Sequence, residues 1–502
     1  MPRDLQAETA ATAIIVGGGF GGLAAALRLR SRGYHVTIID RCARLGGRAE
    51  VFERDGFRHD AGPTVITAPF LFEELFALFG KKMSDYVTLV TPDPWYRFHF
   101  SDGATLDYGP TQDRTEAEIA RFNPADVAGF RRLIAHSKAI YDVAFTKLSD
   151  RPFHSLWFMI RQIPDLLRLK SYESVWKMVS RHLADDRLRQ AFSVQPLLVG
   201  GNPYATTSIY GLITYVEQRD GIWFAMGGTG ALVDALSTLM VEEGIEIRTG
   251  ETVDQIELEN GRACGVRLAS GQVIRSDIVV SDVDPVHLYR NMLPQKAASP
   301  LARFRAKHAT SSMGLYVMYF GARQQWADVA HHTIWFGTRH RELLAEIFRN
   351  ETLPEDFSLY VHRPTATDPS FAPIGCDSFY VLCPVPNLRA GVDWAVEGLR
   401  LRDRIVAALD GSMLPGLKDT ICSEFAMTPN DFKDRYLSVD GAGFSISPYF
   451  TQSAWFRFHN RGEGIPGLYV VGAGAHPGAG LPGVVSSAKT LDHLVPEPVA
   501  VL

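Results

Sequence analysis

The chain contains 502 residues and weighs 55.6 kDa, which is too long for one ordinary domain and predicts two or three. Hydrophobic residues make up 46% and charged residues 21%, which excludes an intrinsically disordered or fibrous protein. The net charge of -5 and the pI near 6.3 offer no basic face, so we expect no nucleic-acid partner. Five cysteines without a Cys-x-x-Cys pair favour a reducing, cytoplasmic location.

The first elements are predicted to be a buried strand over residues 11–16, a glycine turn, a helix over 23–32 and a strand over 35–40. Gly17, Gly19 and Gly22 have the spacing G-x-G-x-x-G, and Asp40 ends the second strand. The three glycines allow a tight turn, the close approach of a pyrophosphate, and tight packing of helix on strand. Asp40 can accept hydrogen bonds from ribose hydroxyls. This unit predicts a dinucleotide site, whereas glycines used for packing alone are the weaker interpretation.

A second motif follows at residues 44–48, which read Arg-Leu-Gly-Gly-Arg, and at residues 56–63, which read Gly-Phe-Arg-His-Asp-Ala-Gly-Pro. It resembles the second signature of the large flavoprotein group that contains amine oxidases and carotenoid desaturases. The resemblance implies FAD rather than a nicotinamide cofactor. Gly47 lets the chain pass close to the cofactor, and Arg48 offers a fork of donors to phosphate oxygens. A surface loop with a solvated arginine is the alternative.

Later segments are expected to complete the same domain. Glycines at 227–230 precede a helix, residues 246–253 form a strand and turn, a hairpin turns at Asn260-Gly261, and residues 274–281 form a strand. In related flavoproteins a valine placed like Val253 meets the adenine. Near the C-terminus, residues 467–474 are predicted to be a strand that enters a glycine turn, and a helix opens at Pro482.

In the flavoprotein group a late motif of this kind brings a helix N-terminus toward the flavin, where its dipole favours negative charge. A glycine loop with no cofactor role is the alternative. The residues that the motifs predict to bind FAD are Gly17, Gly19, Gly22, Asp40, Gly47, Arg48, Val253, Gly472, Gly474, Pro482, Gly483 and Val484.

The predicted fold class is α/β, with a discontinuous Rossmann-type FAD-binding domain, an α+β substrate domain and a helical lobe that faces a membrane. Residues 11–110, 222–290 and 425–502 are assigned to the FAD-binding domain. Residues 111–221 and 291–424 are assigned to the substrate domain.

Nearly the whole chain resembles the bacterial-type phytoene desaturase family. The specific similarity lies in four stretches, at residues 60–67, 197–203, 451–457 and 476–483. The resemblance implies that the enzyme removes hydrogen from a C40 polyene by hydride transfer to flavin N5. It also implies a lipophilic carotenoid substrate, with oxygen or a quinone as the electron acceptor.

No general acid–base pair is identifiable, so the catalytic residues stay unassigned. His476 is a candidate base, but a structural role or a cofactor contact is the stronger interpretation. The pair His331-His332 lacks a third ligand at useful spacing and is interpreted as part of a solvated loop, so no metal is expected.

Several functions remain open besides the desaturation of phytoene. Other carotenoid desaturases and carotenoid isomerases share the flavin motifs. An amine oxidase would share the fold but needs an aromatic cage at the flavin. A non-enzymatic prenyl-lipid binding protein would keep the dinucleotide fold without using FAD.

Residues 151–181 combine six basic residues with many large apolar and aromatic ones. Such a composition is typical of helices that lie on a membrane surface, although an ordinary helical lobe with its apolar face inward fits it equally well. Because the implied substrate is lipophilic, we expect this lobe to contact the membrane, which predicts a cytoplasmic protein that associates peripherally with it. No stretch is predicted to span a bilayer.

Overall fold

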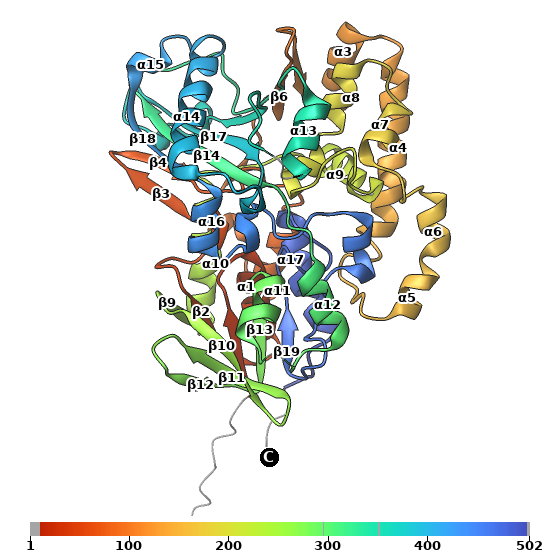
Figure 1. Cartoon of the computed structure of the whole chain (residues 1–502), viewed down its shortest axis with the longest axis vertical. Coiled ribbons are helices and arrows are strands. Elements are labelled where there is room, and N and C mark those ends of the chain that lie inside the picture. Colours follow the sequence, from red (N-terminus) through yellow and green to blue (C-terminus); the bar gives the residue numbers. More distant parts are fainter. Residues whose placement is uncertain (1–10, 295, 350–351, 499–502) are drawn as a thin grey trace, which may run out of the picture.

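The computed structural model describes residues 11–294, 296–349 and 352–498. One part of the molecule is built around a parallel sheet, and the other around a larger mixed sheet flanked by helices (Figure 1).

Five strands form the parallel sheet, and they come from three distant stretches of the chain: β1 (Thr12–Val16), β2 (His35–Asp40), β9 (Glu246–Thr249), β13 (Ile278–Ser281) and β19 (Leu468–Val470). Their order is β19-β13-β1-β2-β9, and every neighbouring pair is parallel. Apolar residues alternate between the two faces, because successive side chains of a strand point to opposite sides. The expectation of an α/β fold with a Rossmann-type parallel sheet is therefore confirmed.

One face of this sheet is covered by helices and the other by a small antiparallel sheet. The helices are α1 (Phe20–Ser31), α10 (Thr229–Glu242) and α17 (Leu481–Lys489), and the small sheet contains β10 (Val253–Glu259), β11 (Arg262–Leu268) and β12 (Val273–Arg275). The expected hairpin at Asn260-Gly261 is present, with both residues at positive φ. Two expected elements differ. The helix predicted from residue 23 begins at Phe20, and the strand predicted over 274–281 is divided between β12 and β13.

A network of ion pairs fastens α1 to α17 and to α2 (Phe70–Ala77). Arg28 is buried within α1 and pairs with Glu74 at 2.7 Å and with Asp492 at 2.8 Å. Lys489 at the end of α17 pairs with the same Glu74 at 2.7 Å. The C-terminal parts of α1 and α17 are thereby linked to each other through α2.

The second sheet has seven strands: β6 (Tyr96–His99), β7 (Thr105–Tyr108), β14 (Gly314–Ala322), β15 (His332–Trp335), β16 (Leu359–His362), β17 (Asp377–Val385) and β18 (Ile421–Met427). Their order is β18-β14-β17-β16-β15-β6-β7, antiparallel except for β15 and β6. The strands β6 and β7 belong to this sheet although they fall within residues 11–110, because Thr333–Trp335 offer β6 a parallel edge.

Helices flank this sheet and carry the rest of the chain. Beside it lie α3 (Gln112–Phe122), α4 (Asp126–Ala144), α7 (Val175–Ser180), α8 (Asp186–Phe192) and α9 (Leu212–Asp220), with α14 (Trp394–Asp410) and α15 (Leu417–Thr420) on the opposite side. The remaining elements are β3 (Val51–Arg54), β4 (Phe57–Asp60), β5 (Leu89–Val90), β8 (Phe224–Ala225), α11 (Pro285–His287), α12 (Pro300–His308), α13 (His340–Arg349) and α16 (Pro429–Tyr436).

Two short helices, α5 (Leu156–Arg161) and α6 (Ile163–Arg168), lie at the margin of the molecule (Figure 1). Within the described residues, no helix combines the length and the apolar character needed to cross a bilayer.

Candidate active site

A single cavity of about 550 Å³ extends from the glycine turn after β1 to the inner face of the seven-stranded sheet. Its walls come from both parts of the molecule. One end is lined by glycines and helix N-termini, and the rest mainly by apolar side chains.

The glycine turn forms the floor of the polar end. Gly17, at φ 97°, and Gly19, the N-cap of α1, both line the cavity. Gly22 does not line it. A Cβ at Gly22 would lie 2.0 Å from the carbonyl oxygen of Gly17, so this glycine serves the close packing of α1 on β1. The amides of the first turn of α1 have no partner within the helix, which suits an anionic group.

Arg48 lies at the same end with Gly47, and both residues line the cavity. Its Nη2 donates to Ser438 Oγ at 2.5 Å, while its buried Nε has no partner among the described residues. Burial lowers the pKa of Arg48, and the nearby carboxyl groups of Asp284 and Asp282 oppose that shift. The interpretation as a solvated surface arginine is therefore wrong. A largely enclosed guanidinium with an unused donor is suited to a phosphate.

The opposite wall of the polar end is the N-terminus of α17. Pro482, Gly483 and Val484 all line the cavity, and so does Gly474. Gly472 lies behind the wall: its amide donates to Ser487 Oγ at 2.8 Å, and a Cβ there would meet Asp282 Oδ1. Two helix N-termini therefore open into one cavity end, where each favours negative charge.

Asp40 and Val253 lie at the carboxyl end of β2 and the start of β10, and both line the cavity. Asp40 is buried and accepts from the amides of Gly18 at 2.6 Å and Cys42 at 2.7 Å. These bonds fix the carboxylate beside the glycine turn, and each oxygen retains capacity for a ribose hydroxyl.

Asp282 follows β13 and borders the cavity beside the glycine turn. Its Oδ2 lies 2.6 Å from the place that a Cβ on Gly19 would occupy. Desolvation raises the pKa of Asp282 to about 7, while the amide of Gly22 and the charge of Arg48 act in the opposite direction. This carboxyl group therefore holds a proton more readily than an ordinary aspartate, close to the expected position of a pyrophosphate.

The apolar end of the cavity lies between the seven-stranded sheet and the helices α4, α5, α6 and α9. Its lining includes Tyr96, Ile334, Leu359, Tyr360, Tyr380 and Leu382 from the sheet, and Ile140, Val143, Met159, Leu166 and Val216 from the helices. Two acidic residues, Asp165 on α6 and Glu217 on α9, also line this end. Desolvation raises the pKa of Glu217 to about 8, and Tyr108 OH donates to it at 3.3 Å. Burial thus favours the protonated form of Glu217, whereas Asp165 at the α6 side is paired with Arg168 at 2.8 Å.

His476 also lines the cavity, on the polypeptide just before α17. Its Nε2 donates to the carbonyl oxygen of Leu148 at 3.3 Å, and its ring packs on Phe153 with centroids 4.7 Å apart. Burial lowers the pKa of His476 to about 4, so the ring is neutral, and its Nδ1 has no partner among the described residues.

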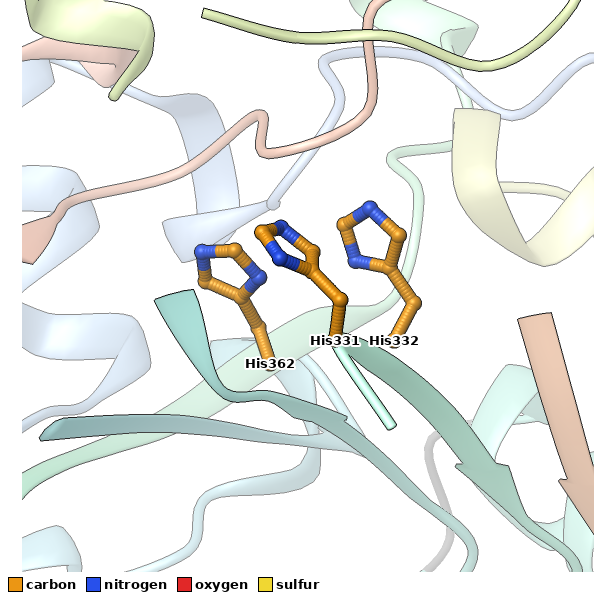
Figure 2. A group of neighbouring side chains, drawn as sticks. All are labelled: His331, His332 and His362. Atoms are coloured by element: carbon orange, nitrogen blue, oxygen red, sulfur yellow. The ribbon is translucent and has the colours of Figure 1, made fainter. Parts of the chain in front are cut away.

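The solvated-loop interpretation of His331 and His332 is wrong. Both side chains are buried, at 4% and 0% exposure, and a third histidine, His362, lies beside them (Figure 2). The third residue was missed because it lies thirty positions away in the sequence and is brought in by the pairing of β15 with β16.

A sequence profile of the flavin containing amine oxidoreductases matches residues 20–490. The phytoene desaturase (lycopene-forming) of Pseudescherichia vulneris is 46% identical over 96% of this chain and 99% of its own length. The chain belongs to the phytoene desaturases, within the flavin-containing amine oxidoreductases. The phytoene desaturase (neurosporene-forming) of Rhodobacter capsulatus is 41% identical over 97% of this chain and 94% of its own.

The chain shares its fold with solved structures of low identity. An oxidoreductase from Methanosarcina mazei superposes with a TM-score of 0.66 at 16% identity, covering 96% of this chain and 100% of that one. Cyclohexylamine oxidase from Brevibacterium oxydans superposes with a TM-score of 0.61 at 15% identity, covering 97% and 98%. These likenesses concern the fold, whereas the expected family, the bacterial-type phytoene desaturases, is confirmed by the profile match and by the identity to its members.

Asp282 and Glu217 were missed by the sequence reasoning. Asp282 could have been found, because it follows the strand predicted over 274–281, and the carboxyl ends of parallel strands meet at the cofactor edge of such a sheet. Glu217 gives no comparable signal, since an acid in a helix usually faces solvent.

Proposed function

We propose that this protein is an FAD-dependent phytoene desaturase that lengthens the conjugation of a C40 polyene. The observation that carries the proposal is the one continuous cavity, which joins a dinucleotide cradle to an apolar chamber. Family membership and the identity to phytoene desaturases over nearly the whole chain support it.

The polar end offers donors that match the parts of FAD. The glycine turn, Arg48 and the first turn of α1 would hold the pyrophosphate, and Asp40 the ribose. Val253 would meet the adenine, and the N-terminus of α17 would lie against the flavin. Held by these residues, FAD would supply the acceptor for a hydride from an allylic carbon of the polyene.

The apolar end supplies positioning and excludes water. Removal of hydride would leave a cation spread over the neighbouring double bonds, and loss of a proton from the adjacent carbon to a weak base would complete the new double bond. Water would trap the cation before that proton is lost. The aromatic and aliphatic walls from β15, β16 and β17 keep water from it, and a protonated Glu217 would add no anion to attack it. The chain thus contributes mainly the orientation of the polyene.

The helices α5 and α6 would be where the polyene enters from a membrane. Their inner side chains Met159 and Leu166 line the cavity, whereas Trp157 and Leu167 are 62% and 59% exposed. Basic residues accompany this apolar surface, and Arg161 lies over the Trp157 ring at 5.8 Å. This pattern suits peripheral association with anionic headgroups at the cytoplasmic surface.

The same proposal assigns the larger divisions of the chain. Residues 11–110, 222–290 and 425–502 would form the FAD-binding domain, apart from β6 and β7, which pair in the seven-stranded sheet. Oxygen or a quinone would reoxidise the flavin.

The test is to incubate the full chain with phytoene in lipid vesicles, with and without FAD, and to separate the carotenoids formed. We expect FAD-dependent formation of a C40 product with more conjugated double bonds, either neurosporene or lycopene. An isomer of unchanged hydrogen content would contradict desaturation, and FAD-independent activity would contradict the cofactor.

A further inference from the structure

Three buried histidine rings meet behind the wall of the cavity, where β15 begins and β16 ends. His331, His332 and His362 are exposed by 4%, 0% and 0%. Their ring centroids lie 4.4, 4.8 and 5.2 Å apart, and Figure 2 shows the rings side by side with His331 in the middle. We call these residues the histidine cluster.

The local backbone explains how two adjacent residues reach the same space. Neighbouring side chains of a regular strand point to opposite faces. His331 lies in the bend before β15, so its ring turns to the side that His332 occupies. His362 is the register partner of His332 in the antiparallel pair of β15 and β16.

The cluster holds four ring nitrogens that have no hydrogen-bond partner among the described residues. They are Nε2 of His331, Nε2 of His332 and both nitrogens of His362. Buried polar atoms in proteins are nearly always satisfied, so a concentration of unsatisfied ones indicates a ligand. Burial lowers the pKa of all three rings well below the ordinary value, which leaves them neutral with lone pairs available.

The other nitrogens of two rings are held in place by hydroxyl groups. His331 Nδ1 lies 2.6 Å from Thr367 Oγ1, and His332 Nδ1 lies 2.7 Å from Tyr360 OH. Histidines that bind a metal through one nitrogen usually have the second nitrogen fixed in this manner, which orients the ring. In the tautomer in which Nδ1 donates to the hydroxyl, Nε2 carries the lone pair of each ring and is oriented as a ligand.

The spacing of the rings suits one ion. The candidate ligand atoms all lie within 4.8 Å of one another. A tetrahedral ion with Zn–N bonds of about 2.0–2.1 Å needs ligand nitrogens roughly 3.4 Å apart. Ring rotations that move the nitrogens by about 1 Å would bring them to this spacing.

We propose that the histidine cluster binds one divalent first-row transition-metal ion, with Zn²⁺ as its simplest occupant. Three imidazole nitrogens with no carboxylate among them favour such an ion over Mg²⁺ or Ca²⁺, which prefer oxygen ligands. A water molecule would complete the coordination. The nearby Arg363 is paired with Asp377 at 2.8 Å, which moderates its repulsion of the ion.

The position of the cluster indicates a structural task. The Tyr360 hydroxyl forms hydrogen bonds with His332 Nδ1 and, at 2.5 Å, with Thr64 Oγ1. Both Tyr360 and Thr64 line the cavity. The ion would tie β15 to β16 and hold Tyr360 in the wall without reaching the polyene.

The test begins with full-length protein that has been treated with a chelator and then dialysed. Titration with Zn²⁺ by calorimetry, followed by elemental analysis, should give one bound ion per chain. The midpoint of thermal unfolding should rise by a few degrees when Zn²⁺ is present well above its dissociation constant.

Variants locate the ion. His362→Phe keeps an aromatic ring between the strands and should abolish both the stoichiometric binding and the rise in midpoint. His340→Phe is the matched control, because His340 is also buried with two unpartnered ring nitrogens but lies outside the cluster. His182→Phe is a second control, because it removes a pair of neighbouring histidine nitrogens outside the cluster, His136 Nδ1 and His182 Nε2 at 3.3 Å. Both controls should bind Zn²⁺ as the parent does.

Two results would overturn the proposal. The first is a parent protein that takes up no stoichiometric Zn²⁺, which decides the matter whether or not the variants fold. The second is undiminished binding by His362→Phe. If that variant is more stable than the parent while Zn²⁺ has no effect on either protein, the cluster serves packing alone.

Discussion

Arg48 brings a positive charge to the polar end of the cavity, and within the described residues no carboxylate forms an ion pair with it. A charge in this position is unfavourable for the apoprotein and useful to a phosphate. Arg48 is therefore expected to strengthen cofactor binding without adding to the stability of the apoprotein.

Arg48→Met should leave the apoprotein as stable as the parent or slightly more stable, because a poorly solvated charge is removed. Loss of a charge-assisted hydrogen bond should weaken FAD binding by about 1.5–3 kcal/mol, or roughly 10- to 150-fold. FAD titration followed by flavin fluorescence measures the affinity. Arg44→Met, an exposed change in the same segment, is the control. Equal affinity in the parent and Arg48→Met would exclude the phosphate contact.

Asp282 should make FAD binding depend on pH. Its pKa in the folded chain is raised to about 7, so the carboxyl group is neutral below that pH and negative above it. A negative charge beside the pyrophosphate is repulsive, so affinity should fall as the pH rises through 7. Because the folded pKa lies above the unfolded value, this group also reduces the stability of the apoprotein as the pH rises from about 4 to 7.

Asp282→Asn supplies the comparison, since it keeps the size of the side chain and removes its titration. We expect a flatter dependence of FAD affinity on pH between 6 and 8 in this variant. An identical slope in both proteins would mean that another group controls the effect.

Site residues could be predicted from the sequence where they belong to one short, contiguous motif. Gly17 and Asp40 belong to one contiguous strand–turn–helix–strand unit, so their spacing alone predicts the site. His362, by contrast, joins His332 through the pairing of two strands that lie far apart in the sequence, β15 and β16. Such register depends on the whole fold, which no short window of sequence contains.

At the scale of elements, the cofactor cradle depends on α1 and α17, whose C-terminal parts are linked through α2. Arg28→Met should remove the ion pairs from α1 to Glu74 and Asp492 and destabilise the protein by about 2–3 kcal/mol, less than a fully buried pair because both acids are partly exposed. Chemical denaturation measures this change. Arg132→Met, an exposed change on α4, is the control. Equal stability of the two variants would mean that apolar packing alone fixes α1 and α17.

The segment 151–181, which is predicted to contact the membrane, includes α5 and α6, and the exposed apolar side chains of these helices allow a sharper test. Phe158 packs on Phe153 with centroids 4.9 Å apart, so it is a poor site for a charge. Trp157 and Leu167 are better choices because both are largely exposed. The double variant Trp157→Glu with Leu167→Glu should sediment less with anionic liposomes while binding FAD normally.

The matched control places the same charges on another exposed apolar surface. Val396 and Leu399 on α14 are 45% and 68% exposed and lie on the far side of the seven-stranded sheet. Val396→Glu with Leu399→Glu should leave sedimentation unchanged. If both double variants sediment like the parent, the polyene enters elsewhere.

At the scale of the whole molecule, the cavity lies where the five-stranded parallel sheet and the seven-stranded mixed sheet face each other. The parallel sheet carries the cradle at the carboxyl ends of its strands, and the seven-stranded sheet provides the apolar wall. The fold class could be predicted because the glycine motifs mark one known arrangement. The limits of the second sheet could not, since β6 and β7 join it from within the first 110 residues.

The central claim is that the polyene reduces the flavin within this one cavity. Phytoene in vesicles should be added to the FAD-loaded chain in the absence of oxygen and quinone, while the visible spectrum is recorded. We expect the band of oxidised flavin to bleach in step with the formation of a longer polyene. Conversion of phytoene without bleaching, or an oxidised flavin that stays unchanged in the presence of bound phytoene, would contradict the account.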